Sequence, residues 1–124
     1  MTDLRDWLNG QHPGLRTYKS FREKALELCA TDAEHRALYR LLANLAGHYI
    51  TAFDEEPLPT DVAKHAYDVF LDLVEEGDRS IGAPVEQQLA HVERSLSVGA
   101  LVAEGVEGVV RAVNDQYVTA GDDE

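Results

Sequence analysis

The sequence predicts an all-α fold, an antiparallel bundle of four to five helices with one long C-terminal helix and a short N-terminal helix. Apolar or small residues recur at strides of three and four across residues 84–117 without a break. This periodicity is typical of a helix packed along its length against other helices. Capping and turn residues divide the rest of the chain into shorter segments of the same period, and strand patterns are absent.

The first two predicted helices occupy residues 2–9 and 15–29. Thr2 is a suitable cap for the short first helix, and Asn9-Gly10 ends it. The second segment has its apolar residues at strides of three and four. The apolar positions are Leu4, Trp7 and Leu8 in the short helix, then Tyr18, Phe21, Ala25 and Leu28.

Two further helices follow. Thr31-Asp32-Ala33-Glu34 has the pattern of a capping box, which predicts a helix from Asp32 to about Phe53. Its wide apolar face predicts a central position in the bundle. Pro57 and Pro59 disfavour helix in the residues before them, so the next helix begins at Thr60 or Asp61 and ends near Gly77.

The long C-terminal helix begins at Pro84 and would be about 50 Å long. We expect it to be continuous, with any bend near Gly105. Its overhang beyond the other helices would leave several valines exposed in a monomer, which predicts a partner, most simply a second copy in a homodimer. The predicted interface consists of Val92, Leu96, Gly99, Ala103, Val106, Val109, Val110 and Val113.

The length of 124 residues predicts a single domain over residues 1–119, followed by a disordered acidic tail over 120–124. The N-terminus lacks the pattern of a signal peptide, no apolar run is long enough for a membrane span, and Cys29 is the single cysteine. We therefore expect a soluble, cytoplasmic protein that does not bind a membrane.

The formal net charge is −12, and it is unevenly distributed. Residues 1–53 contain seven basic and six acidic side chains, a balance of +1, so residues 54–124 carry −13. Direct binding of nucleic acid is not expected, because it requires a clustered basic surface. The acidic half is suited to a basic protein partner, or it serves solubility alone.

No complete catalytic, cofactor or metal site is evident. Di-iron bundles use Glu-x-x-His, and the nearest match is one Asp32-x-x-His35. An acidic line with one histidine on the predicted helix after Thr60 is interpreted as a solvated face (Asp61, His65, Asp68, Asp72). His48 follows Leu41 and Leu45 along an apolar face, so His48 and Tyr49 form the candidate ligand pocket. Cys29 is expected to be a buried, inert thiol, and Ser80 a loop or cap residue.

The sequence alone favours a small non-enzymatic adaptor or regulatory protein that acts through contacts between helices. A first alternative is an acidic inhibitor of a basic protein, such as an immunity or anti-restriction protein that mimics the charge of nucleic acid. A second alternative is a ligand- or metal-binding bundle that uses His48, Tyr49 and nearby groups.

Overall fold

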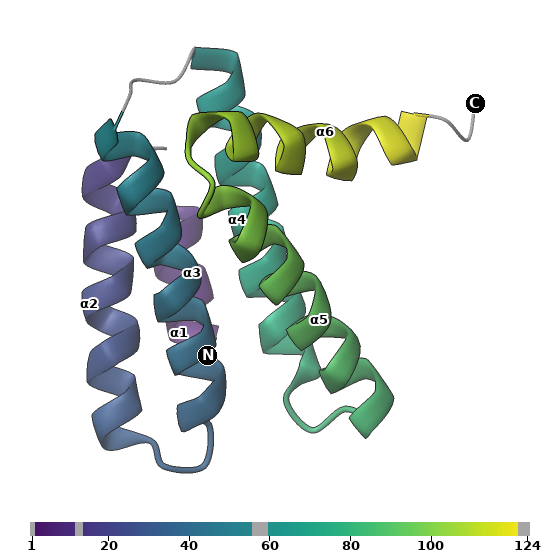
Figure 1. Cartoon of the computed structure of the whole chain (residues 1–124). Helices are drawn as coiled ribbons and strands as arrows, with labels where there is room; N and C mark the ends of the chain where they lie inside the picture. Colours follow the sequence, from purple (N-terminus) through teal and green to yellow (C-terminus); the bar gives the residue numbers. More distant parts are fainter. Residues whose placement is uncertain (1, 12–13, 56–59, 122–124) are drawn as a thin grey trace.

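The computed structural model describes residues 2–11, 14–55 and 60–121, with the backbone alone at 2–3, 54–55 and 115–121. Six helices pack against one another, and the described residues contain no strand (Figure 1). The all-α prediction is therefore confirmed, while the antiparallel bundle arrangement stays a prediction. The helices are α1 (Thr2–Asn9), α2 (Leu15–Thr31), α3 (Arg36–Glu55), α4 (Thr60–Ser80), α5 (Val85–Val102) and α6 (Val106–Gly121).

The core is centred on an aromatic cluster between α2, α3 and α4. The rings of Tyr18 and Tyr49 are stacked with their centroids 5.0 Å apart. Phe70 of α4 meets both rings edge-on, at 5.1 and 5.4 Å. All three side chains are at most 1% exposed, so burial of these rings is a main source of stability.

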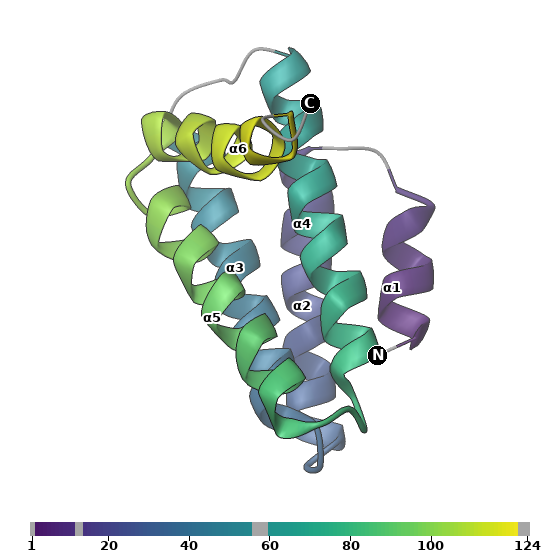
Figure 2. The ribbon, with the colours of Figure 1, turned by 90° about the vertical axis from the view of Figure 1, so that its right-hand side faces the viewer.

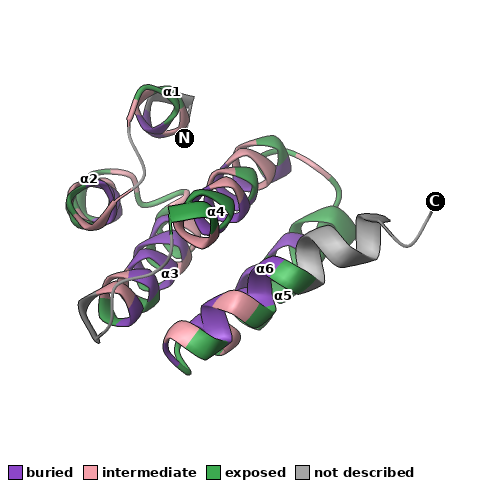
Figure 3. Cartoon of the chain, turned by 90° about the horizontal axis from the view of Figure 1, so that it is seen from above, coloured by how far each residue is buried: buried purple, intermediate pink, exposed green. Residues whose placement is uncertain are grey.

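The other helices flank the pair formed by α3 and α4 on two sides. Seen from above, α1 and α2 lie on one side of α3 and α4, and α5 and α6 lie on the other (Figure 3). The short helix α1 contacts α2 and α4 (Figure 2), and it buries Leu4 and Leu8. The Lys24 ammonium lies 5.1 Å from the centre of the Trp7 ring, a cation–π contact that also joins α1 to α2.

The turn between α2 and α3 differs from the predicted capping box. The hydroxyl of Thr31 donates to the carbonyl of Glu27, so Thr31 belongs to the end of α2. Asp32 replaces it as the capping side chain and accepts the backbone N–H of His35 at 3.3 Å. The predicted start of this helix at Asp32 is therefore wrong, and α3 begins at Arg36.

The prediction of one long C-terminal helix is wrong, because the chain turns sharply between α5 and α6 (Figure 1). Gly105 has a φ of 98°, in the left-handed region that glycine adopts most readily. Gly108 is also required: a Cβ there would lie 1.6 Å from the carbonyl oxygen of Leu101. The glycines that were expected at most to bend the helix therefore produce a full corner.

The corner places α6 over the end of the core. α6 contacts α3, α4 and α5, and it buries Val109 completely and Val113 almost completely. The prediction that these two valines are exposed in a monomer is therefore wrong, while Val106 and Val110 are half-buried. Burying such a side chain stabilises the fold by about 1.5–3 kcal/mol, which a straight extension of α5 would forgo.

Two helix ends also differ from expectation. α4 continues through Gly77 to Ser80, because Gly77 is a point of close approach between α4 and α5 rather than a stop. Residues 120 and 121, assigned by the sequence to the disordered tail, are the last residues of α6, and 122–124 lie outside the described residues. Among the residues described, no helix combines the length and the apolar character of a membrane span.

Candidate functional site

The most unusual feature of the molecule is the orientation of α5. Its outward side carries an apolar line, and several of these side chains are more than half exposed. Val85 is 65%, Leu89 56% and Leu96 58% exposed. Together with Ile81 and Val92, which are each 36% exposed, they form the apolar stripe (Ile81, Val85, Leu89, Val92, Leu96). Scattered exposed apolar residues are ordinary, whereas four at strides of four and three on one helix, with Ile81 in the turn before it, form a candidate interaction surface.

The inward side of α5 is, by contrast, partly polar. His91 and Ser95 are 1% and 2% exposed. The Nε2 atom of His91 lies 2.9 Å from the carbonyl oxygen of Leu73 in α4 and 3.2 Å from the Ser95 hydroxyl oxygen. Because a carbonyl can only accept, the proton lies on Nε2 of His91. The histidine thus fixes the rotation of α5 about its own axis.

Gly77 makes this histidine contact possible. A Cβ at Gly77 would lie 3.0 Å from Cε1 of His91, so a side chain there would push the imidazole away from α4. On the other edge of the same contact, Arg94 forms ion pairs with Asp72 (2.9 Å) and Glu76 of α4. These contacts hold the polar side of α5 against α4 and direct its apolar stripe outward.

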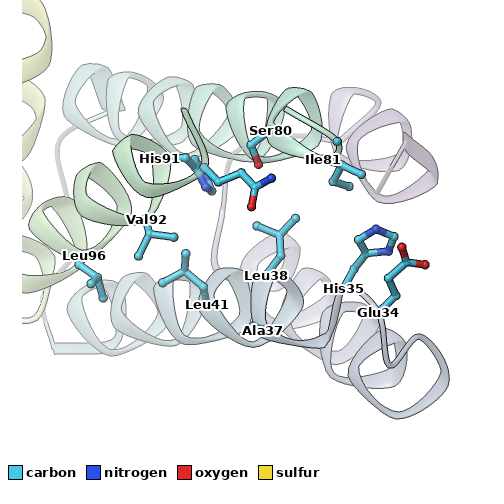
Figure 4. A pocket seen from close by; sticks show the side chains of 12 residues that line it. Glu34, His35, Ala37, Leu38, Leu41, Ser80, Ile81, His91, Val92 and Leu96 are labelled. Carbon is cyan, nitrogen blue, oxygen red and sulfur yellow. The ribbon is translucent and has the colours of Figure 1, made fainter. Parts of the chain in front are cut away.

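The apolar stripe borders a groove between α3 and α5, with a volume of about 540 Å³. Figure 4 shows Leu38 and Leu41 of α3 across from Val92 and Leu96 of α5. His91 and Ser80 contribute polar groups to its wall. The Ser80 hydroxyl donates to the carbonyl of Gly77 at 2.7 Å, which is the cap-like role expected from the sequence. The volume and the lining suit an apolar side-chain cluster or a small molecule.

A polar cluster closes one end of this groove. The carboxylate of Asp32 lies 2.9 Å from Nδ1 of His35 and accepts the hydroxyl of Tyr39 at 3.3 Å. The hydrogen bond with His35 lowers the pKa of Asp32 from its ordinary value. His35 and Glu34 both line the groove, so the hydrogen bond with Asp32 orients the His35 ring at the margin of the groove.

The structure divides the predicted interface into two groups. Val92 and Leu96 lie in the apolar stripe, and Ala103 is exposed at the corner. Gly99 is buried against α3, where an added Cβ would lie 3.4 Å from the His48 ring. The four valines of the interface belong to α6 and are buried or half-buried, so the exposed residues of the predicted interface are Val92 and Leu96 on α5 and Ala103 at the corner.

His48 and Tyr49 do not come together as a ligand pocket. His48 is exposed, beside Gly99 of α5. Tyr49 is buried in the aromatic cluster. In the part of the chain with described side chains, no group of three or more His, Cys, Asp or Glu residues has an arrangement that would hold a metal ion. The predicted burial of Cys29 is confirmed.

Sequence reasoning missed the α3 side of the groove. Leu38 and Leu41 were assigned to the apolar face of a central helix, and both are only half-buried. The available signal was the width of that face, because a helix with more apolar positions than one neighbour can cover has a second contact direction.

Comparisons of the chain with protein-family models, with curated proteins and with solved structures find no significant match.

Proposed function

We propose that this protein is a non-enzymatic helical adaptor or regulator that binds a protein partner along the α3–α5 groove. The observation that carries the proposal is the orientation of α5, which buries His91 and Ser95 while exposing Leu89 and Leu96. The inner side of α5 also buries Val98 and Val102, so the contrast lies in the large apolar side chains left in water. The exposure of Leu89 and Leu96 is best explained by a partner that covers them.

A protein partner fits the stripe better than a small ligand does. Val85 and Leu89, which are both more than half exposed, do not line the groove itself. A small molecule held in the groove would therefore leave them in water. A helix laid along the stripe would cover them together with Val92 and Leu96, as in helix-in-groove recognition.

The two alternatives have less support. An acidic inhibitor needs free carboxylates, and Asp72 and Glu76 on α4 are in ion pairs with Arg94. This alternative would therefore depend on carboxylates such as those of Glu86 and Glu93, which are exposed on α5. A ligand- or metal-binding bundle based on His48 and Tyr49 would need the two side chains in one cavity, and Tyr49 is buried in the aromatic cluster.

A site-specific photo-crosslinking amino acid in place of Leu89 tests the proposal in living cells. We expect a discrete crosslinked protein product, because position 89 lies at the centre of the apolar stripe. The matched control places the same amino acid at Glu23, which is exposed on α2. Absence of a product at position 89, or an equal yield at both positions, would contradict the proposal.

A further inference from the structure

We propose that the partner of the α3–α5 groove is a second copy of this chain, with α5 of each copy lying along α3 of the other. This inference rests on the proposed function, because it names the partner of the same surface. The exposed surfaces of α3 and α5 carry charges of opposite net sign, and these charges distinguish one pairing of two copies from another.

The α5 wall has an acidic edge. Glu86 and Glu93 are exposed and lie three and four residues from Leu89, so they are neighbours of the apolar stripe on the helix surface. The basic residue of this helix, Arg94, is bound to Asp72 and Glu76 on α4. The acidic edge (Glu86, Glu93) therefore faces any helix that covers the stripe.

The α3 wall has a basic edge. Arg36 and Arg40 are exposed, and no Asp or Glu occurs among the described side chains of α3. Glu34, which precedes the helix, lines the groove, so these three residues together carry a net charge of +1. Arg40 follows Ala37, a groove residue, by three positions, which makes the two neighbours on the helix surface. The basic edge (Arg36, Arg40) thus borders the α3 side as the acidic edge borders α5.

These opposite edges select one pairing of two copies. If α5 lay along α5 of the other copy, Glu86 and Glu93 would face the same carboxylates, which is unfavourable. If α5 lies along α3 of the other copy, the acidic edge faces the basic edge, and two-fold symmetry makes this contact twice. The apolar stripe then covers Ala37, Leu38 and Leu41, and no partner of different sequence is required.

The stripe is longer than the part of α3 that lines the groove. Val85 and Leu96 are eleven residues apart on a continuous helix, which corresponds to about 17 Å. The groove-lining residues of α3 run from Ala37 to Leu41, which corresponds to about 6 Å. In this pairing about one turn of α5 covers them, and the rest of the stripe extends beyond the groove.

Charge reversal with rescue tests the proposal. Sedimentation analysis over roughly 1 µM to 1 mM gives the dimer dissociation constant of the wild type. One variant carries Glu86→Lys and Glu93→Lys, which makes both edges basic, and a second carries Arg40→Glu, which removes the sign difference from the other side. Arg36 is left unchanged, because its Nε donates to the carbonyl of Cys29 at 2.7 Å.

We expect each variant alone to dimerise roughly 10-fold or more weakly than wild type, because like charges then face each other. An equimolar mixture of the two variants should form a heterodimer near wild-type strength, since the reversed edges are complementary. Glu23→Lys and Arg16→Glu on the exposed surface of α2 are the matched controls and should leave the dissociation constant unchanged. Circular dichroism verifies that every variant keeps its helix content.

Three results would overturn the inference: a monomeric wild type throughout this range, a dimer insensitive to both reversals, or a mixture no stronger than its components. The photo-crosslink at position 89 separates these failures from failure of the proposed function. A product of twice the chain mass agrees with a second copy. A product with a different protein supports the proposed binding function but contradicts the inference that the groove binds a second copy. Absence of any product contradicts both the proposed function and the inference.

Discussion

The two halves of α3 differ in what covers them. In the half toward its C-terminus, Tyr49 and Ala52 are almost completely buried beneath the aromatic cluster. In the half toward its N-terminus, Leu38 and Leu41 are only half-buried, because α5 diverges from α3 there and leaves the groove open (Figure 1). Tyr39 and Leu42 in the N-terminal half are buried as well, so the difference concerns the one side of α3 that faces the open groove.

The largest difference in the free energy of unfolding is expected between Phe70→Ala and Leu96→Ala. Phe70 is fully buried and contacts the rings of Tyr18 and Phe21, so its truncation should lower the free energy of unfolding by about 3–5 kcal/mol. Leu96 is 58% exposed, so its truncation should change stability by about 0.5 kcal/mol or less in the monomer. Urea unfolding measures both, and similar losses at the two sites would contradict the distinction.

Gly108→Ala tests whether the corner closes the buried end of the molecule. The new Cβ would overlap the carbonyl of Leu101, so α6 must move away from α5. We expect a loss of about 1–3 kcal/mol, the usual range for overpacking. Gly99→Ala is the control, because its Cβ would be 3.4 Å or more from its neighbours. Thermal unfolding followed by circular dichroism compares the two, and equal melting temperatures would contradict the corner.

Tyr18→Phe tests the interior of the aromatic cluster. The Tyr18 hydroxyl is buried and has no hydrogen-bond partner among the described residues, so its removal should leave stability unchanged or raise it by about 1 kcal/mol. The hydroxyl of Tyr67 donates to the carbonyl of Leu8 at 2.8 Å, so Tyr67→Phe should instead lower stability by about 1 kcal/mol. The same direction of change in both variants would contradict this assignment.

The same substitution has a consequence at alkaline pH. Burial raises the pKa of Tyr18 well above 10.0, so above that pH the unfolded chain releases a proton that the folded chain retains. The free energy of unfolding must then decrease as pH rises. We expect this decrease to be shallower in Tyr18→Phe, as measured by urea unfolding at several pH values. Parallel curves for wild type and variant would exclude the contribution of Tyr18.

The smallest effect is expected at the polar end of the groove. The hydrogen bond with His35 lowers the pKa of Asp32 in the folded state. Its stabilising effect is therefore present above the ordinary pKa of an aspartate and disappears as pH falls through the lowered value. Asp32→Asn should flatten this acid limb slightly, and pH-dependent thermal unfolding measures it. An unchanged acid limb would show that the contact adds nothing in solution.

The sequence predicted several elements correctly because their signals are local. The apolar positions Leu4 and Leu8, and the line Tyr18, Phe21 and Ala25, are all buried, as the helical period indicates. The capping box failed because Thr31 and Asp32 are both capable caps, and only the packing of α2 against α3 decides which of them ends a helix.

The predicted interface stays a prediction, and the structure shows which of its residues are accessible. Val92 and Leu96 were assigned to it, and both are exposed in the apolar stripe. Leu38 and Leu41 were not assigned to an interface, because periodicity identifies an apolar face without showing what covers it. The roles of His91 and Gly77 also escaped prediction, because their contact joins two helices and leaves no pattern along either one.

By itself, the sequence determined the helical class, most helix positions and the apolar faces, because these follow from periods and caps within a few residues. The tertiary structure decided which apolar faces are buried. Residues 84–117 carry one unbroken apolar line in the sequence, yet the chain turns at Gly105, so that α6 buries Val109 and Val113 while α5 leaves Val85 and Leu89 more than half exposed. The reason is that α5 is positioned by His91 and Arg94 on α4, and burial depends on the distance to a neighbouring helix, which no local pattern records.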